Sequence, residues 1–483
     1  MRMSAIETTM KLIAVISCVV FLAAALTGCM TRERIAQDLT ESREKAYKEW
    51  VREKERSAGT ERIAEGPLSL ERAVELALTG NRTLQAVLEE KNVAQGRILE
   101  AYGGVLPHVS VGGTYTRKDR DQKEIEGTVY DVGPRDSYAA TLTVTQPLFH
   151  GGASTAALRA SRLYETLTDE SVREAVQGTI YAAMTAYRRA QLVKEQLEVT
   201  KTFVALAEAH LADVEIKRRF GTASDFNVLR SKVELSNARA EMISYQNNYH
   251  EVLTLLFQTM GVSQESSMEL TDVLVYEPFT LDEEQAVRRA FLGRPDLSVA
   301  ELTVKLQEES LNVALSDYWP QVNAFYNQRL TKPDPYIDTY NEWDDAWFAG
   351  IDVTIPIFDG LMREGRVAQE RARLKKQNIN LLDVRERVLY EVKNALLGLR
   401  DATESVEVQK LTLAQAHEGL RLAEVGYREG VLDQVSVLDA RAALMKAELL
   451  YFKSLFDHAA ARIDLEKAMG MLTGPVNHTT AGE

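Results

Sequence analysis

Four short stretches of the chain alternate between apolar and polar residues, a period of two that predicts β-strands with unlike faces. Two lie at residues 107–117 and 138–148, and two more lie within 319–358. The apolar set is Val109, Val111, Tyr115, Ala140, Leu142, Val144, Val322, Ala324, Tyr326, Trp347, Ala349, Ile351 and Val353. The opposite set is His108, Ser110, Thr114, Thr141, Thr143, Thr145, Gln321, Asn323, Gly350, Asp352 and Thr354. Such strands fit a lipid-facing barrel wall or a half-buried soluble sheet, and the alternation leaves both open.

After each strand pair the apolar period becomes seven residues, which predicts long supercoiled helices. From Gly152 to Arg219 there is no proline, and after Gly152 the only glycine is Gly178, so one unbroken helix there would be about 100 Å long. The heptad positions are Val176, Ala183, Ala190, Leu197, Val204 and Leu211, and then Val392, Leu399, Val406, Leu413, Leu420 and Tyr427. A shorter helix is predicted over residues 68–104, where Pro107 follows its end.

Each long helix is followed by a glycine-containing turn and then by a returning helix. Gly221 and Gly430 stand at these turns. Glycine suits the position because a helix C-terminus commonly needs a left-handed residue there. The sequence therefore predicts two helical hairpins, with tips near residues 221 and 430.

The sequence contains an internal duplication. Residues 146–151 (Gln-Pro-Leu-Phe-His-Gly) recur as 355–360 (Ile-Pro-Ile-Phe-Asp-Gly), and the same shift of 209 carries Gly221 to Gly430 and Leu229 to Leu438. Upstream landmarks share a shift of 213, so the difference of four falls in a loop between Pro107 and Pro147. A duplication of this kind predicts two structurally equivalent halves.

Composition narrows the class of protein. A formal net charge of −14 argues against a nucleic-acid partner and suits a solvated surface. The two cysteines, Cys18 and Cys29, both lie near the N-terminus, which leaves no disulfide or cysteine metal site within the repeats. No stretch after residue 28 is apolar enough for a transmembrane helix, so a membrane-crossing mature chain would need closed β-structure.

The N-terminal residues have the layout of an export signal. Lys11 precedes about fifteen apolar or small residues, which end in Leu26-Thr27-Gly28-Cys29. This ending resembles a bacterial lipoprotein signal, in which the cysteine becomes the lipidated first residue of the mature chain. An ordinary cleaved signal with an incidental cysteine is the alternative, and either Met1 or Met10 could be the start.

These patterns divide the chain into five parts: a lipoprotein signal (1–28), a charged tether (29–66), two repeats (67–266 and 267–472) and a tail (473–483). Each repeat is predicted to contain a helix, a β-hairpin and a long helical hairpin. The β-hairpins are expected at about residues 107–149 and 319–358.

The duplicated motifs resemble those of the TolC family of outer-membrane efflux proteins. The resemblance covers about residues 67–472, and it rests on the Pro-Leu-Phe and Pro-Ile-Phe elements and on the paired tips. The first tip reads Gly221 and then Asn227-Val228-Leu229, and the second reads Gly430 and then Ser436-Val437-Leu438. Each motif is weak singly, but together and at one shift they are specific.

The resemblance implies a mixed α/β membrane protein that is mostly helical. Three identical chains would form one tube, in which each chain gives four strands to a twelve-stranded outer-membrane barrel and its helical hairpins to a periplasmic α-barrel. A periplasmic adaptor would dock at the tips, an inner-membrane transporter would supply the energy, and outer-membrane lipid would surround the barrel. The channel would be a passive exit duct for efflux or type I secretion, without a cofactor.

Two departures from the family concern the tips. Family tips often carry aspartate before Val-Leu, where this chain has Asn227 and Ser436. Asp439 matches a second acidic position, and in a threefold tube it would form a ring of three carboxylates that narrows the pore. An exposed helical aspartate near a turn is the simpler interpretation. Likewise Val228, Leu229, Val437 and Leu438 could pack within the hairpins or dock the adaptor.

The sequence offers no catalytic motif. Its seven histidines lack ligand spacing, and no phosphate loop, nucleophile elbow or dinucleotide fingerprint is present, so neither an enzyme nor a metal site is predicted. A periplasmic coiled-coil lipoprotein that scaffolds envelope partners without forming a pore is the alternative function.

Overall fold

The computed structural model describes residues 40–49, 52, 64–117, 122–125, 128–131, 136–332 and 343–472. Contacts divide the chain into two units, one of residues 1–64 with 265–267 and one of 65–264 with 268–483. In the first unit, residues 40–49 form an exposed helix. The strands and long helices described below belong to the second unit.

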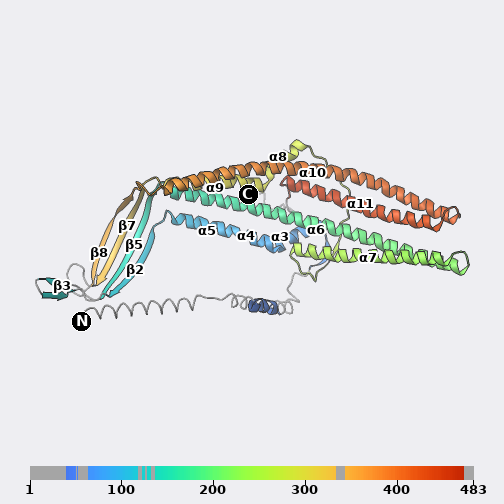
Figure 1. Cartoon of the computed structure of the whole chain (residues 1–483), viewed down its shortest axis with the longest axis horizontal. Coiled ribbons are helices and arrows are strands. Elements are labelled where there is room, and N and C mark those ends of the chain that lie inside the picture. Colours follow the sequence, from blue (N-terminus) through green and yellow to red (C-terminus); the bar gives the residue numbers. More distant parts are fainter. Residues whose placement is uncertain are drawn as a thin grey trace, which may run out of the picture. The chain divides into compact units, whose positions relative to one another are not determined.

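The second unit contains short helices, a strand pair and a long helical hairpin, in that order, twice, with three short helices in the first series and two in the second (Figure 1). The first series is α3 (Leu70–Gly80), α4 (Arg82–Leu88), α5 (Glu90–Gly103), β2 (His108–Arg117), β5 (Asp136–His150), α6 (Ala153–Arg219) and α7 (Asp225–Met260). The second is α8 (Glu283–Gly293), α9 (Pro295–Ser316), β7 (Gln321–Lys332), β8 (Asp344–Thr354), α10 (Met362–Arg428) and α11 (Gln434–Ala468). The two series match the duplication of the motifs.

Three short helices occupy the region where the sequence predicts one helix over residues 68–104. The first break is at Asn81, whose side-chain oxygen caps α4 by accepting from the backbone N–H of Leu84. The second break is at Glu89, which lies between α4 and α5. The prediction of one continuous helix is therefore wrong, because Asn81 caps α4 and its side chain also bonds to the end of α7.

A four-stranded antiparallel sheet has the order β2-β5-β7-β8, so the two repeats meet at the β5–β7 pair. Val111 lies opposite Leu142 across β2 and β5, and Ala324 lies opposite Ile351 across β7 and β8. Because opposed residues share a face, most apolar residues of the four strands lie on one face. Most hydroxyl and amide residues lie on the other face, where Thr143 Oγ1 donates to Asn327 Oδ1 over 2.7 Å, whereas Gln146 and Gln328 lie on the apolar face.

Two smaller sheets accompany the main one. β3 (Gln122–Ile125) and β4 (Thr128–Asp131) form a short hairpin between β2 and β5, which the alternation pattern did not predict. β1 (Glu65–Leu68) pairs with β6 (Ser267–Leu270). Tyr187 on α6 holds this pair, because its buried hydroxyl donates to the carbonyl of Leu68 over 2.8 Å. Burial raises the pKa of Tyr187 to about 12.

The long helices form two hairpins, α6–α7 and α10–α11, with their turns at the end remote from the sheet (Figure 1). The predicted heptad residues are mostly the buried ones: Ala183, Ala190, Leu197, Val204, Val392, Leu399 and Val406. Val199 and Phe203 of α6 pack with Leu444 of α11, which joins the two hairpins. Within the described part of the chain, no helix combines the length and the apolar character needed to cross a membrane.

The end of each hairpin touches the start of its own repeat through a pair of glycines. Gly261 has a φ of +67°, and a Cβ built on it would lie 2.1 Å from the carbonyl oxygen of Gly80. The tip residue Gly430 has a similar φ of +76° but meets open space. Both need left-handed backbone, but only Gly261 also needs the absence of a side chain.

Replacing Gly261 by alanine should therefore destabilise the protein more than replacing Gly430. Each alanine incurs about 1 kcal/mol of left-handed strain, and at Gly261 the backbone near Gly80 must also move, which adds about 1–3 kcal/mol. The thermal unfolding midpoints of the two purified variants measure the difference. Equal midpoints would contradict the close approach.

Candidate functional site

The first hairpin tip is a capped turn. The backbone N–H of Thr222 donates to the carbonyl of Lys217 over 2.9 Å, and Gly221 takes a φ of +75°. Ser224 then caps α7 by accepting from the backbone N–H of Asn227 over 3.3 Å. The backbone of Asn227 therefore takes part in the cap, and its side chain is half-buried.

The second tip repeats this geometry with a stronger cap. The side chain of Asp433 accepts from the backbone N–H of Ser436 over 2.9 Å and from its hydroxyl over 2.7 Å. These hydrogen bonds lower the pKa of the exposed Asp433 below its usual value. Sequence reasoning missed Asp433, although aspartate is one of the favoured residues at the N-cap of a helix.

The apolar tip residues divide between packing and exposure. Val228, Val437 and Leu438 are buried inside the hairpins, while the side chain of Leu229 is 63% exposed. Leu229 is joined on the surface by four further large apolar residues: Phe220, Phe226, Val431 and Leu432. Asp439 is exposed on α11. Of the four Val-Leu candidates for docking, only Leu229 is available to a partner in this arrangement of the chain.

A partly buried polar cluster lies between the two hairpins, within about three helical turns of their tips. We call it the tip cluster, and it consists of His210, Ser231, Glu234, Glu424, Gln434 and Arg441. Gln434 begins α11 and is 7% exposed, and its side-chain nitrogen lies 3.0 Å from His210 Nε2 and 2.9 Å from Ser231 Oγ. Burial and the charge of Arg441 lower the pKa of His210.

The sequence could not have indicated the tip cluster. Gln434 contacts residues on α6 and α7 that are more than 200 positions away. In the sequence, each member taken by itself is typical of the polar face of an amphipathic helix. The cluster exists because the two hairpins pack against each other, which is a property of the tertiary structure.

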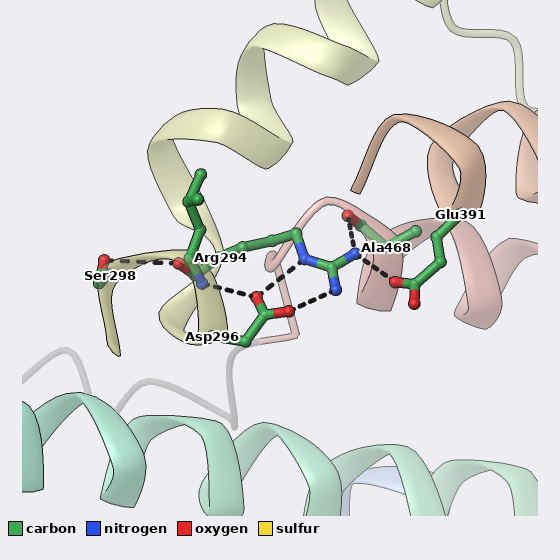
Figure 2. Close-up of polar contacts among 6 residues, drawn as sticks. Arg294, Asp296, Ser298, Glu391 and Ala468 are labelled. Carbon is green, nitrogen blue, oxygen red and sulfur yellow. Dashed lines mark hydrogen bonds and ion pairs between the residues drawn. The ribbon is translucent and has the colours of Figure 1, made fainter. Parts of the chain in front are cut away.

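Arg294 holds a second polar network at the junction of α8 and α9 (Figure 2). Its guanidinium donates to both carboxylate oxygens of Asp296, over 3.0 and 2.7 Å, and to Glu391 Oε2 of α10 over 2.6 Å. It also donates to the carbonyl of Ala468, at the end of α11, over 3.3 Å. Burial raises the pKa of Asp296, but the hydrogen bonds and charge of Arg294 outweigh burial and lower it.

The two faces of the main sheet differ in what they expose. On the apolar face the side chains of Val111 and Ile351 are 78% and 66% exposed. Aromatic residues gather at one end of this face, where the rings of Tyr115 and Tyr138 lie 5.1 Å apart and Trp343 lies 6.4 Å from Tyr138. Trp319 and Trp347 are also exposed, and the Trp347 ring stacks on that of Tyr326 with 6.2 Å between their centroids.

Some predicted features lie outside the described residues. These are the lipidation candidate Cys29, the signal over residues 1–28, the tether apart from residues 40–49, 52 and 64–66, and the C-terminal tail. Over the described ranges, no three metal-binding side chains gather into a group that could hold an ion.

A model of the protein family described as outer membrane efflux protein matches residues 73–262 and 286–471. The chain belongs to this family. The matched blocks fall within the two predicted repeats, and the resemblance to the TolC family is confirmed. Outer-membrane efflux, the function predicted from the sequence, is the function of the family, which consists of transport components rather than enzymes.

Individual relatives agree with this assignment. The chain is 23% identical over 408 residues to the alkaline protease secretion protein AprF of Pseudomonas aeruginosa, covering 82% of this chain and 83% of that protein. It is 22% identical over 413 residues to TtgC of Pseudomonas putida, named as a probable efflux pump outer membrane protein, with 83% of each chain covered.

Solved structures share the fold. The outer membrane protein VceC of Vibrio cholerae aligns with a TM-score of 0.71 at 17% identity, covering 83% of this chain and 96% of that chain. The open state of the MtrE channel of Neisseria gonorrhoeae aligns with a TM-score of 0.69 at 17% identity, covering 83% of this chain and 89% of that chain.

Replacing Arg294 by methionine should be strongly destabilising, because Asp296 and Glu391 would lose their shared cation in a largely buried place. We expect a loss of about 2–3 kcal/mol, below the range for fully buried pairs because Glu391 is partly exposed. The matched control is Arg366→Met, which removes an exposed partner of Asp317 and should cost less than about 1 kcal/mol. Chemical denaturation of both variants measures this, and similar losses would show that the network is not structural.

Proposed function

We propose that the chain forms, as a homotrimer, the outer-membrane channel of a tripartite efflux or secretion system. One observation carries the proposal: a four-stranded sheet has a mainly apolar face, a mainly polar face and two outer strands, β2 and β8, each with a single neighbour among the described strands. The two unlike faces and the unpaired edges each favour the interpretation that the sheet is part of a wall between lipid and water.

The apolar face has the dimensions and composition of a barrel wall in lipid. β8 has 11 residues, and at about 3.3 Å per residue and a tilt near 45° it would span about 25 Å, the height of a membrane barrel's apolar band. Tyr115, Tyr138 and Trp343 gather at one end of the face. Trp319 and Phe149 are exposed near the other. Aromatic residues at both ends suit the two interfaces of a bilayer.

The polar face would line a water-filled lumen. It carries hydroxyl and amide groups such as Thr143, Asn327 and Asn323, and His150 Nε2 lies 2.9 Å from Asn323 Oδ1. These groups can bond to water in a lumen, whereas in lipid they would lack partners. The sidedness therefore favours lipid outside and water inside.

The open edges demand further strands. An unpaired strand edge cannot lie in hydrocarbon, because each free N–H and C=O would lose its hydrogen bond to water. Identical copies supply the complementary edge, β8 of one against β2 of the next. The family resemblance implies three copies and twelve strands. The long hairpins of the three copies would continue the tube into the periplasm.

The tips would meet the partners. A periplasmic adaptor would dock on Leu229 and the exposed residues around Gly221 and Gly430, and an inner-membrane transporter would supply the energy. Asn227, Val228, Ser436, Val437 and Leu438 would shape the tips by capping and packing. Three copies of Asp439 would stand near the axis as an acidic ring. A lipid on Cys29 would add an anchor in the outer membrane.

The relatives bear on the cargo. AprF is named for protease secretion and TtgC as a component of a probable efflux pump, so the relatives include both kinds of system. We infer that this chain is the exit duct of one such system, with the substrate selected by the transporter. A pore-free scaffolding lipoprotein is the competing function, and it does not require an exposed apolar sheet face.

Arginine substitutions on the two faces should separate these functions. Leu142→Arg and Ile351→Arg would place a charge in lipid and should cost about 2–4 kcal/mol in a membrane barrel, reducing the amount assembled in the outer membrane. Thr143→Arg, on the polar face, is the control and should assemble normally. Membrane fractionation followed by quantification measures assembly. A soluble sheet would show equal effects on both faces.

Reconstitution tests the channel itself. Purified full-length protein should run as a trimer in detergent by light scattering and should produce discrete conductance steps in planar lipid bilayers. Three copies are expected because each supplies a third of the wall. A monomer without conductance would overturn the proposal, as would protein released from membranes by salt or alkali.

A further inference from the structure

Two aromatic side chains interrupt the polar face of the main sheet. Among the paired residues that the structure describes on this face, the only large apolar ones are Phe325 of β7 and Phe348 of β8. Their ring centroids lie 6.1 Å apart and the ring planes are inclined at 71°, which is an edge-to-face contact. We call these two residues the aromatic pair. The pair forms an isolated apolar patch on a face made mostly of hydroxyl, amide and small residues.

Gly350 makes room for one of the two rings. It lies directly opposite Phe325 across β7 and β8, and a Cβ built on Gly350 would lie 2.9 Å from Cζ of that ring. An aromatic ring that covers a glycine in this way can stabilise an edge strand. This packing accounts for Phe325 but not for Phe348, which lies opposite Asn327 and has a side chain that is 54% exposed.

A carboxylate lies beside the aromatic pair. Asp352 follows Gly350 on the same face of β8, which makes it a diagonal neighbour of Phe325. Diagonal neighbours are about 7–8 Å apart, within reach of aromatic side chains. Asp352 is exposed, and its hydrogen-bonded partner among the described residues is the hydroxyl of Thr354, over 3.3 Å. Because that hydroxyl is neutral, it does not offset the charge of the carboxylate.

Aromatic rings next to a carboxylate favour a positively charged ligand. The face of a phenylalanine ring attracts a cation electrostatically, and quaternary ammonium groups are recognised in this way. Asp352 adds the attraction of an opposite charge. Arg329 lies on the same face, diagonal to Phe348 on the other side of the pair, and would repel a cation there. The cationic group is therefore expected between the rings and Asp352.

We propose that Phe325, Phe348 and Asp352 form a cargo-binding site on the inner wall of the barrel, and that its ligand is an organic cation with an aromatic ring. The ring of the ligand contacts the aromatic pair, and its charged group lies next to Asp352. The inference rests on the proposed channel function, which places this face of the sheet in water. One site in each chain gives three sites around the axis of a trimer.

The site would retain cargo briefly without closing the duct. Twelve strands about 4.8 Å apart and tilted near 45° make a ring of backbone about 26 Å across, too wide for the phenylalanine rings of different copies to meet. Binding on such an open wall is weak, because water reaches the ligand from several sides. Weak binding suits a conduit, since the cargo must also be able to leave.

Three probes separate the contribution of the ring from that of the charge. Benzyltrimethylammonium has both, tetramethylammonium has the charge without the ring, and benzenesulfonate has the ring with the opposite charge. Saturation-transfer NMR on the purified full-length protein in a neutral detergent, with empty micelles as the blank, measures each dissociation constant. Benzyltrimethylammonium should bind about two- to fivefold more tightly than either of the others, as expected for an exposed cation–π contact. Equal binding of tetramethylammonium, or tighter binding of benzenesulfonate, would overturn the proposal.

Substitutions test where the cation binds. Phe348→Leu removes the ring but keeps an apolar side chain, and Asp352→Asn removes the charge but keeps a hydrogen-bond acceptor. Each should weaken the binding of benzyltrimethylammonium by about two- to fivefold. Phe348→Tyr keeps an aromatic ring and should bind as the native protein does, which separates loss of the ring from a general effect of substitution at this position.

The matched control for the charge is Asp344→Asn. Asp344 lies on the same face of β8 as Asp352, near the other end of the strand and away from the aromatic pair. Its substitution should leave the affinity for benzyltrimethylammonium unchanged. If Asp344→Asn weakened binding as much as Asp352→Asn, the cation would be responding to the overall charge of the face, and the proposed site would be wrong.

Single-channel recording in planar bilayers tests whether cargo meets the site in transit. Benzyltrimethylammonium should lower the mean current through native channels more than tetramethylammonium at the same concentration, and Phe348→Leu should reduce this difference. An equal effect of the two cations on native channels would contradict a cargo site. If the native protein never conducts, the proposed function fails, and the NMR titrations still decide whether the site binds the cation.

Discussion

The antiparallel pairing of β5 with β7 fixes the relation between the two repeats. It is the only strand pair that joins residues of both repeats in the main sheet, and its register aligns Leu142 with Gln328 and Val144 with Tyr326. A slip of one residue would place the apolar face of one repeat beside the polar face of the other. The β5–β7 register is irregular only between Pro147 and Phe149, at the end of β5 that leads into α6. The sidedness of the sheet and the direction of both hairpins depend on this single register.

Much of the architecture follows from local periodicity. Strand alternation marks the four strands, and the heptad pattern marks the faces of α6 and α10 that pack, because burial selects apolar residues with the period of each element. Ala190 and Val392, both predicted heptad positions, are completely buried. The turns were predictable for a similar reason, since Gly221 and Gly430 both have left-handed backbone.

What the sequence did not predict depends on contacts between distant segments. The break at Asn81 needs the end of α7 nearby, because the Asn81 side chain also donates to the carbonyl of Thr259 over 3.1 Å. The tip cluster needs both hairpins. Among the predicted tip residues, Leu229 is exposed whereas Leu438, its equivalent in the second repeat, is buried, and no local pattern distinguishes them. Such differences arise from how the halves pack on each other.

The repeats have diverged at equivalent positions. Asn81 and Arg294 are related by the shift of 213, and each donates to a backbone carbonyl at the end of the hairpin in its own repeat. Asn81 donates to the carbonyl of Thr259, and Arg294 donates to that of Ala468. Only Arg294 also binds two carboxylates (Figure 2). The second hairpin is thereby fastened at its base by a charged network that the first lacks. In any closed ring built from copies of this chain, hairpins with and without the charged network would therefore alternate. The rotational repeat of the ring would be one chain, made of two hairpins, and not one hairpin, so a protein that docks on the ring would meet two different kinds of hairpin.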